Sequence, residues 1–281
     1  MQLLVKDTAF DTTNTREYDL SIRISADGFS FCIYHVASKT FVHWKHLAFP
    51  LQDTQYYRCQ AIALCEPYFE YEFNRVFVVF SDTANTIIPE GIFNVTDYPL
   101  IFSYNFPEIA KSTSDILSNS LAVFSLTNLF SLTKEQRKFW KELFPNVVFT
   151  HFQTPLIEAI LRESKKENRQ EVWVHIQKKN IFLVYAEKGK LIFSNTFPIQ
   201  SATDIAYLCG NVYEQFGLSQ HTTKLVVLGV EATNNEPYSL LSTHFANIHL
   251  HHPPTEMSYH SSFNTNDIQS ISDLLVLPLC V

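Results

Sequence analysis

One short segment of this chain occurs twice. Residues 49–53 read Phe-Pro-Leu-Gln-Asp, and residues 197–201, 148 positions later, read Phe-Pro-Ile-Gln-Ser. Each occurrence follows a stretch with the alternating pattern of short strands and precedes a stretch with the spacing of an amphipathic helix. Because the match lies at the same joint of the same pattern, the sequence predicts a duplicated fold in which both halves form one supersecondary unit.

Both halves are predicted to contain a three-stranded antiparallel meander followed by a helix. In the first half, Asp27-Gly28 favours a tight hairpin turn, and Asp53 can cap the helix. In the second half, Ser201 and Asp204 have the spacing of a capping box, and Gly217 favours a helix end. The predicted strands are 19–25, 29–36 and 40–49 in the first half and 171–177, 181–186 and 191–197 in the second.

A second repeated segment marks the far end of the unit. Residues 146–151 resemble residues 247–252, which lie only 101 positions later. Because this offset is shorter by 47 positions, the first half contains extra residues, which we place around 68–120. The sequence therefore predicts a first domain over 1–165 with this insertion and a second domain over 166–281.

The position of the insertion depends on which strand of the first half matches 224–229. We favour 121–126, which precedes a helix over 133–144 with a capping box at Thr133 and Gln136. Residues 75–80 also resemble 224–229, at an offset of 149. This alternative moves the insertion but keeps the duplication.

The order of elements resembles a known fold. Three antiparallel strands, a helix, a strand, a helix, a strand and a helix, occurring twice, resemble the actin-like ATPases, in which two ribonuclease H-like domains face each other across a nucleotide cleft. The Phe-Pro-aliphatic-Gln joint, the segment 86–89 followed by Ile92-Phe93, and residues 277–280 resemble an uncharacterised bacterial family with this fold. The resemblance implies an α/β fold of tandem ribonuclease H-like domains, each a mixed sheet with flanking helices, and no assigned activity.

The glycine-rich loops that this resemblance implies are largely missing. Actin-like ATPases hold ATP with two Asp-x-Gly phosphate hairpins and a Gly-Gly adenosine loop, where glycine lets backbone amides approach the phosphates. This chain has only 6 glycines. The first hairpin has Ser25 in place of the carboxylate, the second has Lys178 and Lys179 without aspartate or glycine, and Gly229 alone matches the adenosine loop.

No catalytic or metal-binding residue is predicted. Asp19 and Glu171 start the first strands of the two halves, where exposure to solvent is expected. His249 and His251 lie on one face of a predicted strand, which is compatible with a metal, but the sequence identifies no further ligand. We therefore interpret these two histidines as structural.

Composition narrows the partners and the location. The net charge is −7 and the isoelectric point is about 5.9, which argues against nucleic acid as the main partner. The N-terminus lacks the apolar core of a secretory signal, and no stretch reaches the ~20 apolar residues that span a bilayer. The five cysteines are odd in number and lack CxxC spacing. We expect a cytoplasmic protein without membrane insertion.

Two functional hypotheses follow. The first is a catalytically degenerate actin-like scaffold, a pseudo-ATPase without a cofactor, that binds another protein. Its candidate partner surface is the aromatic part of the insertion, and the alternative is that these aromatics cover the domain's own core. The aromatic residues are Tyr71, Phe73, Tyr98, Phe102, Tyr104 and Phe106. The second hypothesis is a divergent ATPase or sugar-kinase-like enzyme that binds ATP with magnesium through Gly229, Ser25 and Lys178 or Lys179.

Overall fold

The computed structural model divides the chain into two compact units. The first contains residues 1–154 and 256–262, and the second contains residues 155–255 and 263–281. The structure describes residues 2–5, 10–25, 28–48, 55–81, 84–110, 114–229, 235–251, 257–259, 274 and 277.

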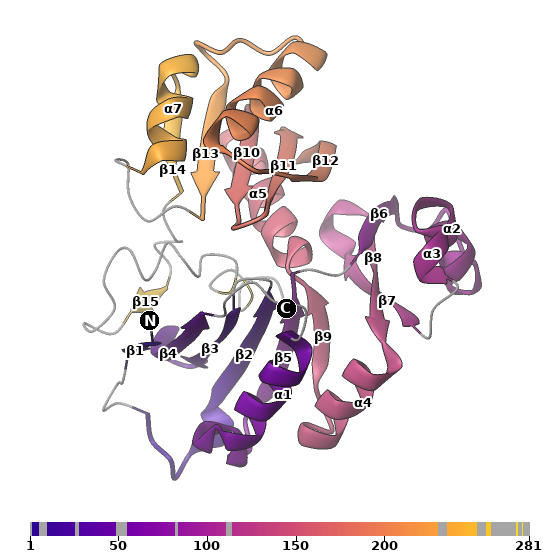
Figure 1. Cartoon of the computed structure of the whole chain (residues 1–281), viewed down its shortest axis with the longest axis vertical. Helices are drawn as coiled ribbons and strands as arrows, with labels where there is room; N and C mark the ends of the chain where they lie inside the picture. Colours follow the sequence, from indigo (N-terminus) through magenta and orange to yellow (C-terminus); the bar gives the residue numbers. More distant parts are fainter. Residues whose placement is uncertain are drawn as a thin grey trace. The chain divides into compact units, whose positions relative to one another are not determined.

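The first unit is built on a seven-stranded mixed sheet (Figure 1). Six of its strands have the order β1-β4-β3-β2-β5-β9, and the seventh, β15, pairs with β4. The antiparallel meander is β2 (Tyr18–Ser25), β3 (Gly28–His35) and β4 (Thr40–Ala48). The remaining strands are β1 (Gln2–Val5), β5 (Arg75–Phe80), β9 (Val148–His151) and β15 (Ser258–Tyr259). Strand β5 pairs in parallel with β2, and β9 pairs in parallel with β5.

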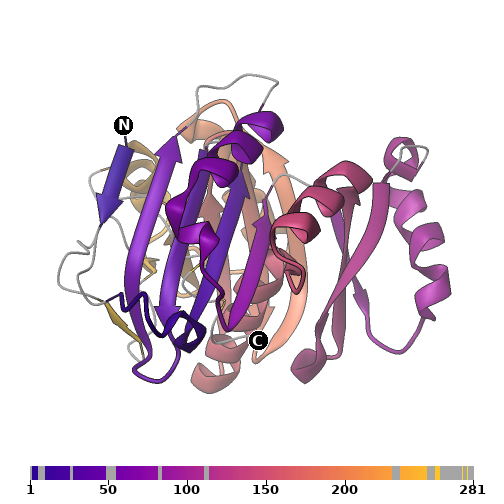
Figure 2. The same cartoon turned by 90° about the horizontal axis from the view of Figure 1, so that it is seen from below.

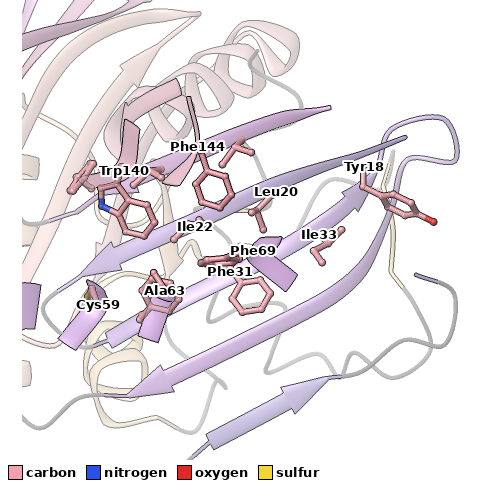
Figure 3. Packing of buried hydrophobic residues seen from close by; sticks show 14 of the residues in the cluster. Tyr18, Leu20, Ile22, Phe31, Ile33, Cys59, Ala63, Phe69, Trp140 and Phe144 are labelled. Atoms are coloured by element: carbon pink, nitrogen blue, oxygen red, sulfur yellow. The ribbon is translucent and has the colours of Figure 1, made fainter. Parts of the chain in front are cut away.

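Two helices cover one face of this sheet, α1 (Gln55–Cys65) and α4 (Lys134–Leu143) (Figure 2). The alternation of β2 places Leu20 and Ile22 on this face, where they join Cys59 of α1 and Trp140 of α4 (Figure 3). Trp140 is fully buried. Burial of these side chains between the two helices and the sheet forms the core of the unit.

A smaller sheet lies between β5 and α4 in the chain. Its order is β6-β8-β7, with both pairs antiparallel. Its elements are β6 (Asn85–Pro89), α2 (Tyr98–Asn105), α3 (Pro107–Ala110), β7 (Ser114–Leu121) and β8 (Leu126–Thr133), with short 3-10 helices over Val95–Asp97 and Ala122–Phe124. Phe102 and Leu129 form a separate small core with Ile88.

The sheet pairing selects the alternative match for the fourth strand. Strand β5 pairs with β2 as β13 (Lys224–Leu228) pairs with β10 (Gln170–Ile176), both in parallel. Residues 121–126 instead fall in the small sheet and its connection. The insertion therefore follows β5 and occupies residues 81–133, not 68–120. Two apolar runs of similar length gave the same sequence signal, and only the strand register distinguishes them.

The second unit has a five-stranded sheet with the order β12-β11-β10-β13-β14. Its other strands are β11 (Asn180–Glu187), β12 (Lys190–Pro198) and β14 (Ile248–Leu250), and its helices are α5 (Gln153–Glu167), which the chain follows out of the first unit, α6 (Ala202–Gln215) and α7 (Glu236–His244). The predicted capping box at Ser201 and Asp204 is confirmed. Gly217 has a φ of +63° just after α6, which confirms the predicted helix end.

Candidate functional site

Asp19, the second residue of β2, and Glu171, the second residue of β10, are buried, so the prediction of exposure was wrong. Asp19 accepts hydrogen bonds from Arg75 Nη2 at 2.6 Å, Arg75 Nε at 3.1 Å and Asn74 Nδ2 at 2.8 Å. Glu171 accepts hydrogen bonds from Arg169 Nε at 2.5 Å and Trp173 Nε1 at 3.1 Å. Both carboxylates are 0% exposed.

The same register produces both ion pairs. Asp19 lies opposite Arg75 in the β2–β5 pair, and Glu171 lies opposite Lys224 in the β10–β13 pair. Lys224 Nζ lies 3.4 Å from Glu171 Oε1. Since each unit holds an acid and a base at this position, the arrangement joins the first strand to the fourth. This accounts for both carboxylates as parts of the fold.

A polar pocket of about 360 Å³ lies beside the ion pair of the second unit. Burial, and then the charges of Lys224 and Arg169, lower the pKa of His249. Burial, and then the charge of Glu171, raise the pKa of Glu163, although Lys224 and Arg169 oppose the rise. The residues that line this pocket are Arg169, Gln170, Thr222, Thr223, Lys224, Asn247 and His249. Because Arg169 and Lys224 both pair with carboxylates, the pocket offers a charge-balanced wall and not an anion site.

The two histidines of the last strand have different surroundings. His249 Nε2 lies 2.8 Å from Asn247 Oδ1, whereas the His251 ring packs 5.2 Å from the Trp173 ring. Within the described ranges, no group of three or more histidine, cysteine or acidic side chains is placed to hold a metal ion.

The candidate nucleotide residue of the first unit is Ser25. It is buried, ends β2 and donates a hydrogen bond from Oγ to the Gly28 carbonyl at 3.2 Å. Ala26 and Asp27 lie outside the described residues. Gly28 is the first residue of β3, where a Cβ would lie 2.3 Å from the Leu47 carbonyl oxygen. The close approach of β4 therefore explains the glycine at this position.

The candidate residues of the second unit are neighbours at one end of the sheet. Lys178 and Lys179 are exposed in the β10–β11 turn, which the Gln177 amide closes by donating to the Asn180 carbonyl at 2.9 Å. Gly229 follows β13 with a φ of +80°, and a Cβ there would lie 2.1 Å from the Ile176 carbonyl oxygen. Packing of two backbone segments therefore requires Gly229 without reference to a ligand. Ser25 belongs to the other unit.

Most of the aromatic residues proposed as a partner surface serve the cores of the first unit. Phe102 is fully buried, and Tyr98 and Phe106 pack against it. Phe73 packs against the core of the main sheet. Tyr104, in contrast, is 78% exposed. The alternative interpretation, in which these aromatics cover the unit's own core, is thus correct for all four packed residues.

A different set of apolar side chains is exposed at one end of the small sheet. Ile92, Phe93 and Val95 follow β6, and Val123 lies between β7 and β8. Their exposed fractions are 66%, 41%, 72% and 60%. The two connections meet where the Glu90 amide donates to the Ser125 carbonyl at 2.8 Å. We call these four residues the tip patch.

Sequence reasoning did not identify the tip patch as a surface. Ile92-Phe93 contributes to the family resemblance alone. The available signal was Gly91, which has a φ of +78° and directly precedes three apolar residues out of four, a pattern that fits neither strand nor helix. Apolar residues in such a turn have no predicted core to face.

The insertion is acidic where the structure describes it. Between 84 and 110 and between 114 and 133, every charged side chain is a carboxylate. These are Glu90, Asp97, Glu108 and Asp115.

None of the described helices has the length and hydropathy needed to cross a membrane.

Comparison with known structures confirms the actin-like fold. The chain is similar to a Bacteroides thetaiotaomicron protein with an actin-like ATPase fold and unknown function, with a TM-score of 0.83 and 22% identity over 97% of this chain and 99% of that chain. It is also similar to the PilM–PilN type IV pilus biogenesis complex (TM-score 0.63, 11% identity, 94% and 98% covered). A third similar structure is the ethanolamine utilization protein EutJ from Carboxydothermus hydrogenoformans (TM-score 0.50, 9% identity, 94% and 90% covered).

These likenesses show the fold, and the family follows from the sequence. A comparison with functionally curated proteins finds no match. The sequence profile of one family, described as protein of unknown function (DUF3822), matches residues 7–248. Since this match spans most of the chain, the protein belongs to this family of unknown function with an actin-like ATPase fold.

Proposed function

We propose that this protein is a catalytically degenerate actin-like scaffold that binds another protein through the tip patch. The observation that carries the proposal is the exposure of Ile92, Phe93, Val95 and Val123 at one end of the inserted sheet. Apolar side chains gathered at one place on a surface mark interaction sites far more often than isolated ones do. Their burial against a partner would remove them from water.

The candidate nucleotide positions support the degenerate part of the proposal. In the second unit the Gln177 amide is already bonded to the turn, and Gly229 is required by the Ile176 carbonyl. In the first unit Ser25 stands where the resemblance places a carboxylate that organises a metal. Neither hairpin sequence has the Asp-x-Gly spacing that the resemblance implies for the phosphate cradle of an active ATPase.

The nature of the partner follows from charge. The described carboxylates of the insertion favour a partner surface that is apolar and neutral or basic, and they disfavour nucleic acid, which is held through its phosphates. PilM, which shares the fold, forms a pilus biogenesis complex with PilN, so a protein partner is compatible with this architecture. We also propose a cytoplasmic location, because the described cysteines are free thiols and three of the four are buried.

Nucleotide binding is the second candidate function. Gly229 turns sharply after β13, beside the β10–β11 turn that carries Lys178 and Lys179, where the resemblance places nucleotide loops. ATP with magnesium would then contact these residues of the second unit. A thermal-shift titration with ATP, ADP and GTP, with and without magnesium, tests this. A melting temperature that rises and saturates with nucleotide concentration would favour nucleotide binding over the scaffold. At 100-fold over the dissociation constant, the ligand adds ~2.7 kcal/mol to the free energy of unfolding.

The scaffold is tested by replacing apolar side chains of the tip patch. A Phe93→Asp and Val95→Asp double variant should lose the proteins that co-purify with the wild-type chain after crosslinking in cells. The matched control is Leu64→Asp, because Leu64 is 68% exposed on α1 outside the insertion. Recovery of the same proteins with all three chains would contradict the proposal.

A further inference from the structure

A groove of about 650 Å³ follows helix α6 in the second unit. One wall is made by α6, which contributes the buried Tyr213 and six further residues, and the rest comes from residues after α6 and from the C-terminal end of α7. The six residues are Thr203, Ala206, Tyr207, Gly210, Asn211 and Glu214. They form two adjacent rows, 203–206–210–214 and 203–207–211–214, with spacings of three and four, so they lie on one face of the helix.

This face carries a projecting side chain beside a hollow. Tyr207 is 67% exposed. Three residues later, a Cβ placed on Gly210 would have no heavy atom within 4 Å. Glycine weakens the interior of a helix relative to alanine, and nothing in the described part of the chain fills the space beside it. The hollow is therefore available to a side chain from outside.

We propose that the occupant is a second copy of this chain, which packs its own α6 antiparallel on this one. A two-fold axis that crosses α6 between Leu208 and Cys209 pairs the six residues among themselves. Tyr207 then meets Gly210, Ala206 meets Asn211, and Thr203 meets Glu214. Each large side chain lies opposite a smaller one, which is the self-complementarity that a two-fold interface needs.

The charges of this face agree with the same symmetry. Glu214 is the only one of the six residues that carries a charge at neutral pH. The axis places it opposite Thr203, whose hydroxyl can donate to the carboxylate. The two copies of Glu214 lie at opposite ends of the contact, separated by 11 residues, or about 16 Å along the helices. Repulsion between like charges is therefore avoided.

The size of the contact sets the expected affinity. Helix α6 has 14 residues and is about 21 Å long, so a contact along it is small beside the ~1,600 Å² of a typical stable interface. The dimer should therefore dissociate on dilution. Sedimentation velocity of the full chain between about 1 and 300 μM should show a monomer that converts to a dimer.

Variants at the knob and the hollow test the pairing. Gly210→Gln fills the hollow with a good helix former and should weaken dimerisation at least about tenfold. Tyr207→Ala removes the knob and should do the same. The double variant Tyr207→Ala and Gly210→Tyr exchanges knob and hollow, so it should restore the dimer. Tyr104→Ala, at an exposed tyrosine of the other unit, should leave the dimer unchanged.

Circular dichroism melting measures whether each variant is folded. If Gly210→Gln does not fold, the affinity of the Tyr207→Ala dimer alone tests the pairing. A monomer at every concentration would overturn the proposal. A dimer with unchanged affinity in Tyr207→Ala would also overturn it, because the contact would then lie on another surface. If the groove instead binds a different protein, the wild-type chain would be a monomer that captures that protein, and the Tyr207→Ala variant would not capture it. This result would also overturn the proposal.

Discussion

Arg75 donates two hydrogen bonds to one carboxylate oxygen of Asp19, from Nη2 at 2.6 Å and from Nε at 3.1 Å. Asp19 is completely buried, and the two residues face each other across the β2–β5 pair. The second unit repeats the relationship with Glu171 and Lys224. The duplication thus preserved the position of an ion pair while both of its residue types changed.

Removal of the buried carboxylate should destabilise the first unit. Asp19→Ala leaves the charge of Arg75 beside an apolar interior without its partner, which is expected to lower the free energy of unfolding by about 3–5 kcal/mol. Urea unfolding measures the change. Glu72→Ala is the matched control, because Glu72 pairs with Arg16 in full contact with solvent and should change little. Equal effects of both variants would contradict the role assigned to Asp19.

Alanine substitutions at Gly229 and Gly91 distinguish the cost of a positive φ from the cost of a steric clash. Their φ values are +80° and +78°, but a Cβ on Gly229 would lie 2.1 Å from the Ile176 carbonyl oxygen, whereas a Cβ on Gly91 would meet nothing within 4 Å. Gly91→Ala should lower the free energy of unfolding by about 1 kcal/mol. Gly229→Ala should lower it by about 2–4 kcal/mol, because a clash is added. Similar losses in thermal and urea unfolding would show that the turn after β13 relaxes.

Glu163 should make stability depend on pH. Burial and the nearby Glu171 raise the pKa of Glu163, so the folded chain binds this proton more tightly than the unfolded chain does. Its stabilising contribution is therefore complete below the unfolded pKa of about 4.3 and is lost as the pH rises through the higher folded pKa. The free energy of unfolding of Glu163→Gln relative to wild type should rise between pH 4 and pH 7.

Urea unfolding at several pH values measures this difference. The exposed Glu142 on α4 provides the control variant Glu142→Gln, whose difference from wild type should stay nearly constant. A difference for Glu163→Gln that falls with pH would mean that its contact with Lys224 outweighs burial.

The cysteines should differ sharply in reactivity. Burial raises the pKa of the Cys209 thiol, so the reactive thiolate is scarce, and Cys32 and Cys59 are also buried. Cys65 is exposed at the end of α1. In a Cys280→Ser background, which removes the cysteine outside the described residues, iodoacetamide should label Cys65 alone in the native chain. Mass spectrometry that finds rapid labelling of Cys209 would contradict the packing of α6.

Local features of the fold were predictable from the sequence because neighbouring residues produce them. The capping boxes at Thr133 and Ser201 are confirmed, since a hydroxyl and an acid or amide three residues apart satisfy the first helical amides without help from the rest of the chain. Alternation along 19–25 gave β2 with its apolar side toward the core. The repeated joint, which depends on five residues, was enough to indicate the duplication.

The candidate site was less predictable, because exposure depends on residues distant in the chain. Tyr98 and Tyr104 belong to the same short aromatic stretch, yet one packs against a core and the other is exposed. Ile92 and Val123 are 31 positions apart and reach the same end of the small sheet only through the β6–β8–β7 pairing. Their spacing in the sequence contains no sign of this proximity.

The sequence by itself determined the element types, the duplication and the loss of glycine from the expected phosphate loops, because these depend on local spacing and residue type. Tertiary structure decided which apolar run became the fourth strand. It also buried Asp19 and Glu171. Strand register is fixed by pairing across the sheet, and a charge can be buried only where a partner meets it, so both outcomes depend on residues that the chain brings together from a distance.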